Sequence, residues 1–242
     1  MQQLVSTNPC TGEEIWRGPI ADAAAVDAAV ARARQAQTGW EDTPLELRIA
    51  VLRRYADAVK ARADEVGRVI ARETGKPFWE TKTEAASVAA KVDISIRAQA
   101  ERAGEHLTQA DGLVQAVRHR PLGVLAVLGP YNFPAHLPNG HIVPALLAGN
   151  AVLFKPSELA PATAELMGQL WSEAGLPDGV LEIVQGDGTT GKALADHESI
   201  DGLLFTGSSP TGKALAQQFA QTPHKMLALE MGGNNPLVVW DV

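Results

Sequence analysis

The apolar run from Val124 to Leu128 constrains the fold of this chain more than any other stretch. A short run rich in valine and leucine indicates a buried strand. The run ends at Gly129-Pro130, and the side-chain amide of Asn132 follows just before Pro134, a residue suited to opening a helix. In an open α/β sheet, ligands bind at the carboxyl ends of the strands. The stretch therefore predicts a strand that delivers an N–H donor to a ligand site.

The pattern of strand, polar turn and helix recurs four more times downstream. We predict strands at Val124–Leu128, Ala151–Phe154, Leu181–Val184, Gly202–Phe205 and Met226–Leu229, and helices at Pro134–Leu147, Pro161–Ala174, Thr190–Asp196 and Pro210–Gln221. Strands that alternate with helices across short turns indicate βαβ units and a parallel sheet. The predicted fold class is therefore α/β, a Rossmann-like parallel sheet with flanking helices.

The first third of the chain has a helical pattern. Asp22 is a suitable N-cap for an alanine-rich helix that ends near Gln37. A second helix starts at Thr43-Pro44 and breaks near 61–64, a third ends at Glu73, and a fourth covers roughly 79–104. We expect these helices to form a layer packed on the sheet.

Two further segments read as strands. Residues 113–120 alternate apolar and polar side chains, which indicates an exposed or edge strand that invites pairing with another chain. Residues 236–240 form a final apolar strand that runs into the end of the sequence. A domain does not usually end on such a strand, so we expect the chain to be cut short there.

Charge and composition exclude several classes of function. The formal net charge is -7 and no long basic run is present, which argues against nucleic-acid binding. No apolar run approaches the roughly 20 residues of a membrane span, so no membrane contact is expected. The single cysteine, Cys10, excludes an internal disulfide, and no signal peptide is visible, so we expect a cytoplasmic protein. No metal site is predicted.

Two glycine-rich turns stand between a predicted strand and a predicted helix. Gly186–Gly191 satisfies the dinucleotide pattern G-x-G-x-x-G, and both this turn and Gly207–Gly212 read G-x-x-x-x-G-K. A phosphate loop of an NTPase needs Ser or Thr after that lysine to bind Mg²⁺, but Ala193 and Ala214 stand there. An ATPase or GTPase is therefore disfavoured.

The two turns differ in what they favour. For 186–191, a tight turn made possible by glycine and a ligand site remain equally good interpretations. For 207–212 we favour binding, because Ser208 and Ser209 are able to cap the next helix. The free N–H groups of that helix would then point at a phosphate.

Taken together, the motifs resemble those of the NAD(P)-dependent aldehyde dehydrogenase superfamily over the whole chain. They are GPYNFP (129–134), FKPSE (154–158), FTGSSPTG (205–212) and LEMGGNNP (229–236), in the family's order. Each motif alone is weak, but four in sequence at strand ends are specific. The commoner family pattern has lysine after the paired glycines, where this chain has Asn234.

The resemblance implies two catalytic residues. Asn132 matches the amide that donates to the oxyanion of the reacting aldehyde, although a turn-forming asparagine is the plainer alternative. Glu230 matches the general base that activates water. A carboxylate at the mouth of a dry crevice would have a raised pKa, which suits that role. A salt-bridged structural glutamate is the alternative for Glu230.

The resemblance also implies an NAD site. Lys155 and Glu158 match the residues that bind the adenosine ribose, and a carboxylate there repels a 2′-phosphate, so NAD is favoured over NADP. A helix N-terminal charge, with Ser157 as cap, is the alternative for Glu158. The expected pyrophosphate loop is Gly207, Ser208, Ser209, Pro210, Thr211 and Gly212, and Gly188 with Thr189 is expected to border the adenine.

The resemblance implies that residues 1–242 are an N-terminal cofactor-binding domain, with 105–121 in a strand arm that joins subunits of a homo-oligomer. The catalytic domain and its nucleophilic cysteine would be absent, since Cys10 lies in a turn far from the motifs. We then expect the chain to bind NAD without turnover, and the full-length protein to oxidise a small acidic semialdehyde.

Several alternatives remain open at the level of sequence. The enzyme could be another semialdehyde dehydrogenase or a betaine-aldehyde dehydrogenase. The chain could instead be a nucleotide-binding module or a non-catalytic structural protein. His136 and His141, near the Asn132 turn, are candidates for the substrate tunnel and equally for packing on their own helix.

Overall fold

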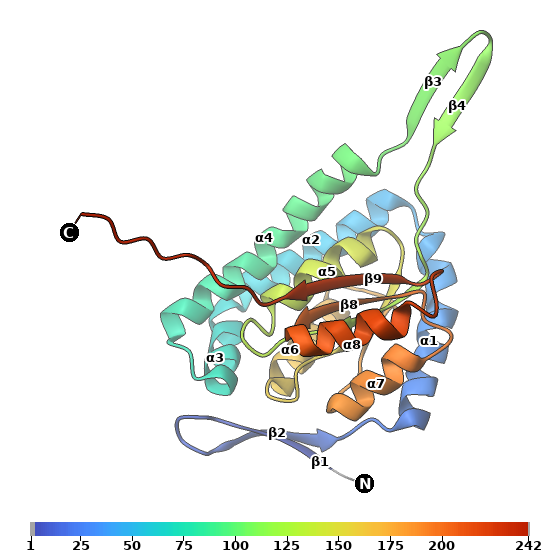
Figure 1. The fold of residues 1–242 in the computed structure, drawn as a ribbon. Coiled ribbons are helices and arrows are strands. Elements are labelled where there is room, and N and C mark those ends of the chain that lie inside the picture. Colours follow the sequence, from blue (N-terminus) through green and yellow to red (C-terminus); the bar gives the residue numbers. More distant parts are fainter. Residues whose placement is uncertain (1–2, 242) are drawn as a thin grey trace.

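The computed structural model describes residues 3–241. The chain opens with an antiparallel hairpin of β1 (Gln3–Thr7) and β2 (Glu14–Pro19). This hairpin was not predicted. It lies at the edge of the molecule (Figure 1) and is tied to the body where Ser6 Oγ donates to Glu73 Oε1 at 2.9 Å. A tertiary contact of this kind leaves no local sequence pattern.

The predicted helices of the first third are present. They are α1 (Ala23–Glu41), α2 (Leu45–Ala61), α3 (Ala63–Thr74) and α4 (Phe78–Arg102). Asp22 caps α1 by accepting from the Ala25 N–H at 2.9 Å, as predicted. The α1 helix continues through Gly39 to Glu41, because its last turn is buried at Trp40 against the core.

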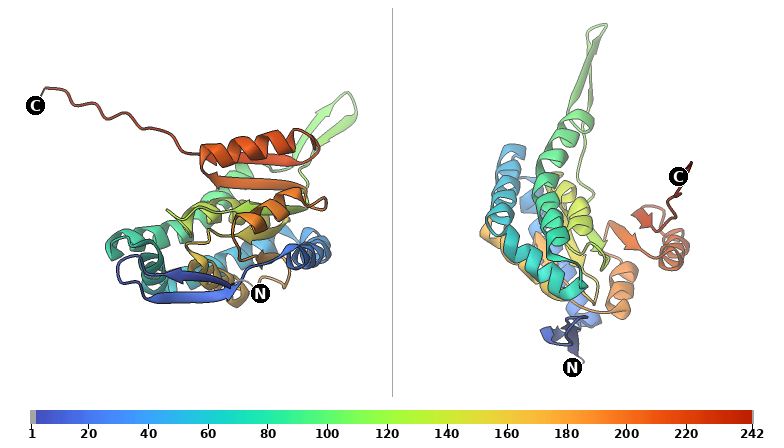
Figure 2. Two further views of the ribbon diagram at one scale, coloured as in Figure 1. Left: turned by 60° about the horizontal axis from the view of Figure 1, so that its bottom comes forward. Right: turned by 90° about the vertical axis from the view of Figure 1, so that its left-hand side faces the viewer.

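A second hairpin replaces the single strand predicted at 113–120. It consists of β3 (His106–Ala110) and β4 (Leu113–Val117), which pair antiparallel. The strand prediction therefore missed β3 and extended β4 too far. The hairpin projects away from the body in every view (Figures 1 and 2). Its apolar side chains, including Leu107, Leu113 and Val114, are more than half exposed.

The core is a five-stranded parallel sheet, which confirms the predicted fold class. Its spatial order is β7-β6-β5-β8-β9. The strands are β5 (Val124–Leu128), β6 (Ala151–Lys155), β7 (Leu181–Ile183), β8 (Gly202–Gly207) and β9 (Met226–Met231). The connecting helices are α5 (His136–Leu147), α6 (Pro161–Glu173), α7 (Gly188–Asp196) and α8 (Ser209–Phe219).

Helices cover both faces of the sheet. Leu125 and Val127 of β5 pack with α2, α4, α5 and α6, whereas Val124 and Ala126 pack with α1, α7 and α8. This alternation places successive side chains of one strand on opposite faces. The helical layer formed by α2, α3 and α4 lies on the first face, and α1 crosses to the second. The central strands β5 and β6 are therefore buried on both faces.

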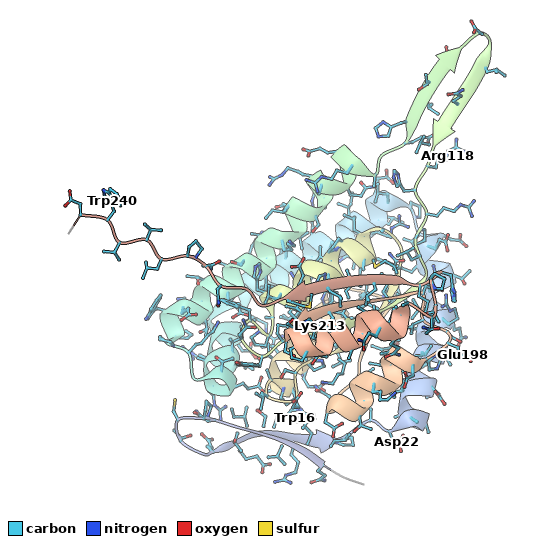
Figure 3. All side chains as sticks on the ribbon, viewed as in Figure 1. Trp16, Asp22, Arg118, Glu198, Lys213 and Trp240 are labelled. Carbon is cyan, nitrogen blue, oxygen red and sulfur yellow. The ribbon has the colours of Figure 1, made fainter. Side chains whose placement is uncertain are left out.

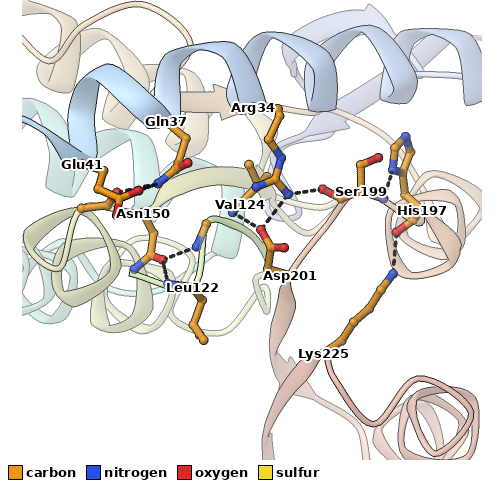
Figure 4. A network of polar contacts seen from close by, with 12 residues as sticks. Arg34, Gln37, Glu41, Leu122, Val124, Asn150, His197, Ser199, Asp201 and Lys225 are labelled. Carbon is orange, nitrogen blue, oxygen red and sulfur yellow. Dashed lines mark hydrogen bonds and ion pairs between the residues drawn. The ribbon is translucent and has the colours of Figure 1, made fainter. Parts of the chain in front are cut away.

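A polar network fixes the amino ends of the strands (Figure 4). Asp201 Oδ2 accepts from the Val124 N–H and from Arg34 Nη2, both at 2.6 Å. Asn150 Oδ1 accepts from the N–H groups of Leu122 and Gly123 at 2.7 and 2.9 Å. These bonds join the starts of β5, β6 and β8, so the network stabilises one edge of the sheet and leaves the other edge for a site.

The prediction of a strand at 236–240 is wrong. Residues 232–241 have no regular structure and are exposed, with Leu237 at 89% and Trp240 at 88%. The segment leaves the body beyond β9 (Figure 1), and Trp240 lies near its outer end (Figure 3). No neighbouring strand pairs with it among residues 3–241, so its apolar pattern alone does not produce a strand.

None of the helices within residues 3–241 has the length and apolar character needed to cross a membrane. The same residues contain no cluster of three or more His, Cys, Asp or Glu side chains arranged to hold a metal ion.

Candidate functional site

A pocket of about 1120 Å³ opens at the carboxyl edge of the sheet. Chain order runs from β5 to β7 on one side and then returns through β8 to β9 on the other, so β5 and β8 flank the reversal. Ligands bind in the crevice at such a reversal in open α/β sheets. Residues following β5, β6, β8 and β9 all line the pocket. This is the predicted convergence of strand ends.

Asn132 lies in the turn that follows β5. It is exposed and lines the pocket together with Gly129 and Pro130. The turn has no helical or strand structure of its own, and α5 begins four residues after Asn132, at His136. The position of the amide therefore depends on what holds the start of α5.

A buried carboxylate holds the start of α5. Glu84 of α4 accepts from the N–H groups of Ala135 and His136 at 3.1 Å each. Burial raises the pKa of Glu84, and the two N–H donors together with the Lys76 charge oppose that shift. The Lys76 ammonium lies 3.4 Å from the centre of the Phe133 ring, in the same turn as Asn132. No local sequence pattern indicates this support, because Glu84 and Ala135 are 51 residues apart.

Lys155 and Glu158 form the wall of the pocket that follows β6. The Lys155 side chain is buried, donates to the Pro156 carbonyl at 2.8 Å and lies 3.6 Å from Glu158 Oε2. Burial lowers the pKa of Lys155, and the Glu158 carboxylate opposes that shift. Glu158 is half exposed. The pair presents a donor and an acceptor side by side.

The structure does not support the alternative in which Glu158 is a charge at the start of a helix that Ser157 caps. Ser157 Oγ accepts from the Leu159 N–H at 3.3 Å, while α6 begins later, at Pro161, with Ala160 as its N-cap. Glu158 therefore precedes the helix and faces the pocket rather than capping α6.

The first glycine turn opens α7. Its N-cap is Asp187, whose carboxylate accepts from the Thr189 N–H at 2.8 Å. That backbone hydrogen bond holds the pKa of Asp187 below its usual range. Gly188 lines the pocket and begins α7, two residues before the predicted helix start at Thr190. Gly191 lies against the Lys155 stem.

The second glycine turn opens α8. Its N-cap is Ser208, whose Oγ accepts from the Thr211 N–H at 3.4 Å and lies 2.9 Å from Thr211 Oγ1. Gly207, Ser208 and Thr211 line the pocket. Ser209 and Pro210 form the first turn of α8 and do not line it.

Gly212 also stands outside the pocket lining. A Cβ there would come within 2.4 Å of Met231 Sδ. The Met231 side chain of β9 occupies the space beside this glycine, which is a structural reason for its place in the motif.

Glu230 lines the pocket from β9, but its surroundings differ from the prediction. Its side chain is exposed rather than enclosed in a dry crevice. The cause is the place of β9 at the edge of the sheet, where residues 226–229 are only half buried. The dry surroundings expected for this carboxylate are therefore not present.

The two histidines of α5 differ in whether they line the pocket. His141 lines the pocket, and its Nε2 lies 3.2 Å from Thr206 Oγ1. Burial lowers the pKa of His141, the Glu230 charge opposes this, and the Lys91 charge adds to it. His136 does not line the pocket, and its Nδ1 is buried without a hydrogen-bond partner among residues 3–241.

The family follows from a match over nearly the whole chain. A model of the aldehyde dehydrogenase family covers residues 2–242. This chain belongs to the aldehyde dehydrogenase family. The N-succinylglutamate 5-semialdehyde dehydrogenase 1 of Caulobacter vibrioides is 58% identical over 99% of this chain and 51% of its own length. The N-succinylglutamate 5-semialdehyde dehydrogenase of Burkholderia lata is 59% identical over 99% and 49%. The chain spans about half the length of these curated relatives.

Solved aldehyde dehydrogenases share the fold. An aldehyde dehydrogenase from Brucella melitensis biovar abortus has a TM-score of 0.90 and 33% identity, over 96% of this chain and 48% of that one. An NADP-dependent glyceraldehyde-3-phosphate dehydrogenase from Bacillus halodurans, complexed with NADP, has a TM-score of 0.89 and 28% identity, over 96% and 50%.

The only cysteine in this aldehyde dehydrogenase sequence is Cys10. It is exposed in the β1–β2 turn, and a Cβ at Gly75 would lie 3.6 Å from its sulfur. The end of α3 is thus its neighbour, and it does not line the pocket. The sequence prediction that Cys10 is remote from the motifs is confirmed.

Sequence reasoning missed two kinds of site residue. Glu84 acts through the backbone of a distant helix. Lys91 lines the pocket without belonging to any recognised motif, and Thr206 lines it from within FTGSSPTG (205–212), where it was given no role. Lys91 sits on the long α4 helix, where a lysine normally indicates only a solvated face. Only the packing of α4 on α5 brings it to the pocket.

Proposed function

We propose that this chain binds NAD in the pocket at the carboxyl edge of the sheet. We further propose that the full-length gene product uses NAD to oxidise N-succinyl-L-glutamate 5-semialdehyde to N-succinyl-L-glutamate, a step of arginine breakdown. Relatives that are 57–59% identical carry the corresponding name. The observation that carries the proposal is that Asn132, Lys155, Glu158 and Glu230 line one pocket, and that the start of α8 lines the same pocket.

The residues of the pocket fit a dinucleotide in their chemistry. Lys155 and Glu158 offer a donor and an acceptor to the hydroxyls of the adenosine ribose. The start of α8 at Ser208 offers backbone N–H groups and the positive end of the helix dipole to the pyrophosphate. Beside Gly188 there is open space, since a Cβ there would meet no heavy atom within 4 Å. Bound NAD supplies the hydride acceptor.

Glu158 supports NAD rather than NADP as the cofactor. Its carboxylate is half exposed beside Lys155, where it can accept from both ribose hydroxyls. A 2′-phosphate at the same place would add a second negative charge next to it. This electrostatic cost is the basis of the proposed preference.

Two residues are proposed to act on the aldehyde itself. The side-chain amide of Asn132 donates to the oxygen that gains negative charge, and one such donor typically contributes about 3–4 kcal/mol of transition-state stabilisation. Glu230 accepts a proton from water in the hydrolytic step, as general bases do. The exposure of Glu230 leaves water free to reach it.

The proposed chemistry needs a nucleophile that this pocket lacks. An aldehyde dehydrogenase of the kind that the motifs resemble attacks the aldehyde with a cysteine thiolate. Cys10 is remote from the pocket. We therefore propose that these 242 residues bind NAD but do not by themselves turn over an aldehyde.

The β3–β4 hairpin is proposed as part of an oligomerisation arm of a homo-oligomer. It presents the exposed apolar side chains of Leu107, Leu113, Val114 and Val117 on a projecting ribbon. Edge strands with apolar side chains readily pair with another chain. The proposed partners are thus a small aldehyde and other copies of the protein. Neither nucleic acid nor membrane is proposed, and the proposed location is cytoplasmic.

Calorimetric titration of the 242-residue chain with NAD and NADP tests the cofactor proposal. We expect NAD to bind more tightly than NADP. Glu158→Gln should weaken NAD binding about tenfold, as expected for one charge-assisted hydrogen bond. It should also reduce the difference in affinity between NAD and NADP. Glu173→Gln, at an exposed carboxylate that pairs with Arg62 away from the pocket, is the control. Equal affinities for NAD and NADP in the unsubstituted chain would contradict the proposal.

Steady-state kinetics test the activity. The full-length gene product should oxidise the semialdehyde with NAD, and Asn132→Ala should lower its kcat by about 100- to 1,000-fold. The 242-residue chain should show no turnover under the same conditions. Robust turnover by the short chain would refute the assignment of the nucleophile.

A further inference from the structure

Lys91 is a charged residue of the pocket to which the proposed chemistry gives no role. It lies on α4, is half buried and lines the pocket. Within residues 3–241 it forms no ion pair, whereas Lys82 of the same helix pairs with Asp64 at 2.8 Å. A partly buried ammonium without a counter-charge favours an anionic ligand, because burial weakens its contact with water.

A glycine on the neighbouring helix makes room for this ammonium. Gly140 lies inside α5, where glycine is a poor helix former. A Cβ at Gly140 would lie 3.5 Å from Lys91 Cε and 3.8 Å from Nζ, so the end of the lysine passes directly over the glycine. Both residues line the pocket. Any side chain larger than alanine at 140 would fill the space beside the charge.

The ammonium lies at the end of the pocket where the aldehyde is proposed to react. Lys91 and Gly140 flank His141, whose ring is close enough to both Lys91 and Glu230 for each charge to act on its pKa. Asn132 stands four residues before α5 and lines the same pocket. The proposed adenine end is formed by α7, which packs on the opposite face from α4 and α5 (Figure 1). The charge is thus placed for the substrate rather than for the adenosine half of the cofactor.

We propose that Lys91 binds a carboxylate of the substrate and so selects acidic aldehydes. This inference rests on the proposed function, because it specifies how the same pocket recognises its substrate. The chain carries a formal net charge of -7, which repels a dianionic semialdehyde unless a local cation compensates. Lys91 supplies that cation beside the reacting groups. A lysine ammonium is a compact charge that can donate to a carboxylate without a fixed geometry.

The test compares substrates that differ by one carboxylate, using the full-length gene product. N-succinyl-L-glutamate 5-semialdehyde carries two carboxylates. N-butyryl-L-glutamate 5-semialdehyde lacks the succinyl carboxylate, and 4-(succinylamino)butanal lacks the α-carboxylate. Lys91→Met should lower kcat/KM for the full substrate about 10- to 100-fold, mainly through KM, since a charge-assisted bond is lost from both ground and transition states.

The penalty should shrink to about twofold for whichever analogue lacks the carboxylate that Lys91 contacts, because the substitution then removes nothing. Lys91→Arg should restore most of the activity toward the full substrate. Lys82→Met, on the same helix and outside the pocket, should behave like the unsubstituted enzyme. A merely structural role of Lys91 would lower the activity with all three aldehydes alike.

Two outcomes are separable. If the unsubstituted enzyme oxidises the semialdehyde and Lys91→Met has the same penalty with all three substrates, the inference is overturned and the proposed function stands. If the unsubstituted enzyme oxidises none of the three aldehydes, the proposed function is overturned, and this inference with it.

Discussion

The two glycine turns of this molecule look alike in sequence and differ in what they offer a ligand. Gly186–Gly191 and Gly207–Gly212 share the pattern G-x-x-x-x-G-K, each follows a strand of the sheet, and each opens a helix that lines the pocket. Each helix also has a side-chain N-cap, Asp187 in one and Ser208 in the other. Comparing the two turns distinguishes the packing role of the glycines from the electrostatic effect of the N-cap residue.

Close packing explains why glycine is the first residue of each turn. A Cβ at Gly186 would lie 2.0 Å from Thr190 Oγ1, and one at Gly207 would lie 2.5 Å from the Phe205 ring. Both glycines therefore allow a close approach within the protein. Neither observation distinguishes a binding turn from a structural turn, which is why the sequence left the first turn open.

The charge of the cap does distinguish the two turns. The Asp187 carboxylate, kept ionised by its hydrogen bond to the Thr189 N–H, neutralises the positive end of α7. Ser208 caps α8 without a charge. The start of α8 therefore keeps its attraction for an anion, and the start of α7 does not. The predictions below test this difference, from the largest expected effect to the smallest.

Placing a carboxylate at the start of α8 should make the second turn resemble the first. Ser208→Asp retains a good N-cap but brings a negative charge to the proposed pyrophosphate site, so NAD affinity should fall about 100-fold, or about 2.7 kcal/mol. Titration calorimetry measures the change. Ser208→Asn, a neutral cap, is the control and should bind nearly as the unsubstituted chain does. Unchanged affinity in Ser208→Asp would mean that no phosphate binds there.

Adding one methyl group should show that glycine in the first turn serves packing. Gly186→Ala forces its Cβ against Thr190 and should lower the free energy of unfolding by about 2 kcal/mol. Urea denaturation measures this. Gly188→Ala meets no heavy atom within 4 Å and serves as the control with little change. Equal free energies of unfolding for the two variants would contradict a packing role for Gly186.

Removing the cap of α7 should cost stability rather than affinity. Asp187→Ala loses the hydrogen bond to the Thr189 N–H and should lower the free energy of unfolding by about 1 kcal/mol. Asp187→Asn keeps a cap and should retain most of that stability. Loss of NAD binding in Asp187→Asn, with stability retained, would show that the carboxylate itself belongs to the cofactor site.

The charge of Asp187 should also appear as a small pH dependence. Its folded pKa lies below the ordinary value of 3.8, so the ionised group stabilises the fold above that value, and this contribution is lost as pH falls through the folded pKa. The difference in unfolding free energy between the unsubstituted chain and Asp187→Asn should be about 0.5 kcal/mol or less at pH 7, because the group is exposed. It should disappear as the pH falls through the folded pKa of Asp187, which lies below 3.8. A difference that grows toward acid pH would reverse the assigned sign.

Much of the architecture was predictable because its signals are local. The run at Val124–Leu128 is apolar on both faces, as a central parallel strand must be, and the structure buries it between two helical layers. The caps of α1 and α8 were visible as Asp22 and Ser208. The β1–β2 hairpin was not visible, because its place depends on a contact between Ser6 and Glu73.

The site was predictable in part for the same reason. Asn132, Lys155, Glu158 and Glu230 each lie at or just beyond the carboxyl end of a strand, so one topological rule brought them to one pocket. The surroundings of Glu230 were not predictable, because an apolar strand pattern does not reveal whether the strand lies at the centre or the edge of the sheet.

The sequence by itself determined the order of strands and helices within the parallel sheet and its layers, the family, and the polar residues at the strand ends, because strand runs, caps and turn residues act over a few positions. Tertiary structure alone decided which face each helix covers and that Glu84 holds the start of α5. It also decided that Lys91 reaches the pocket over Gly140. These contacts join residues about 50 positions apart, and a local pattern carries no information about which distant side chain fills the space beside it.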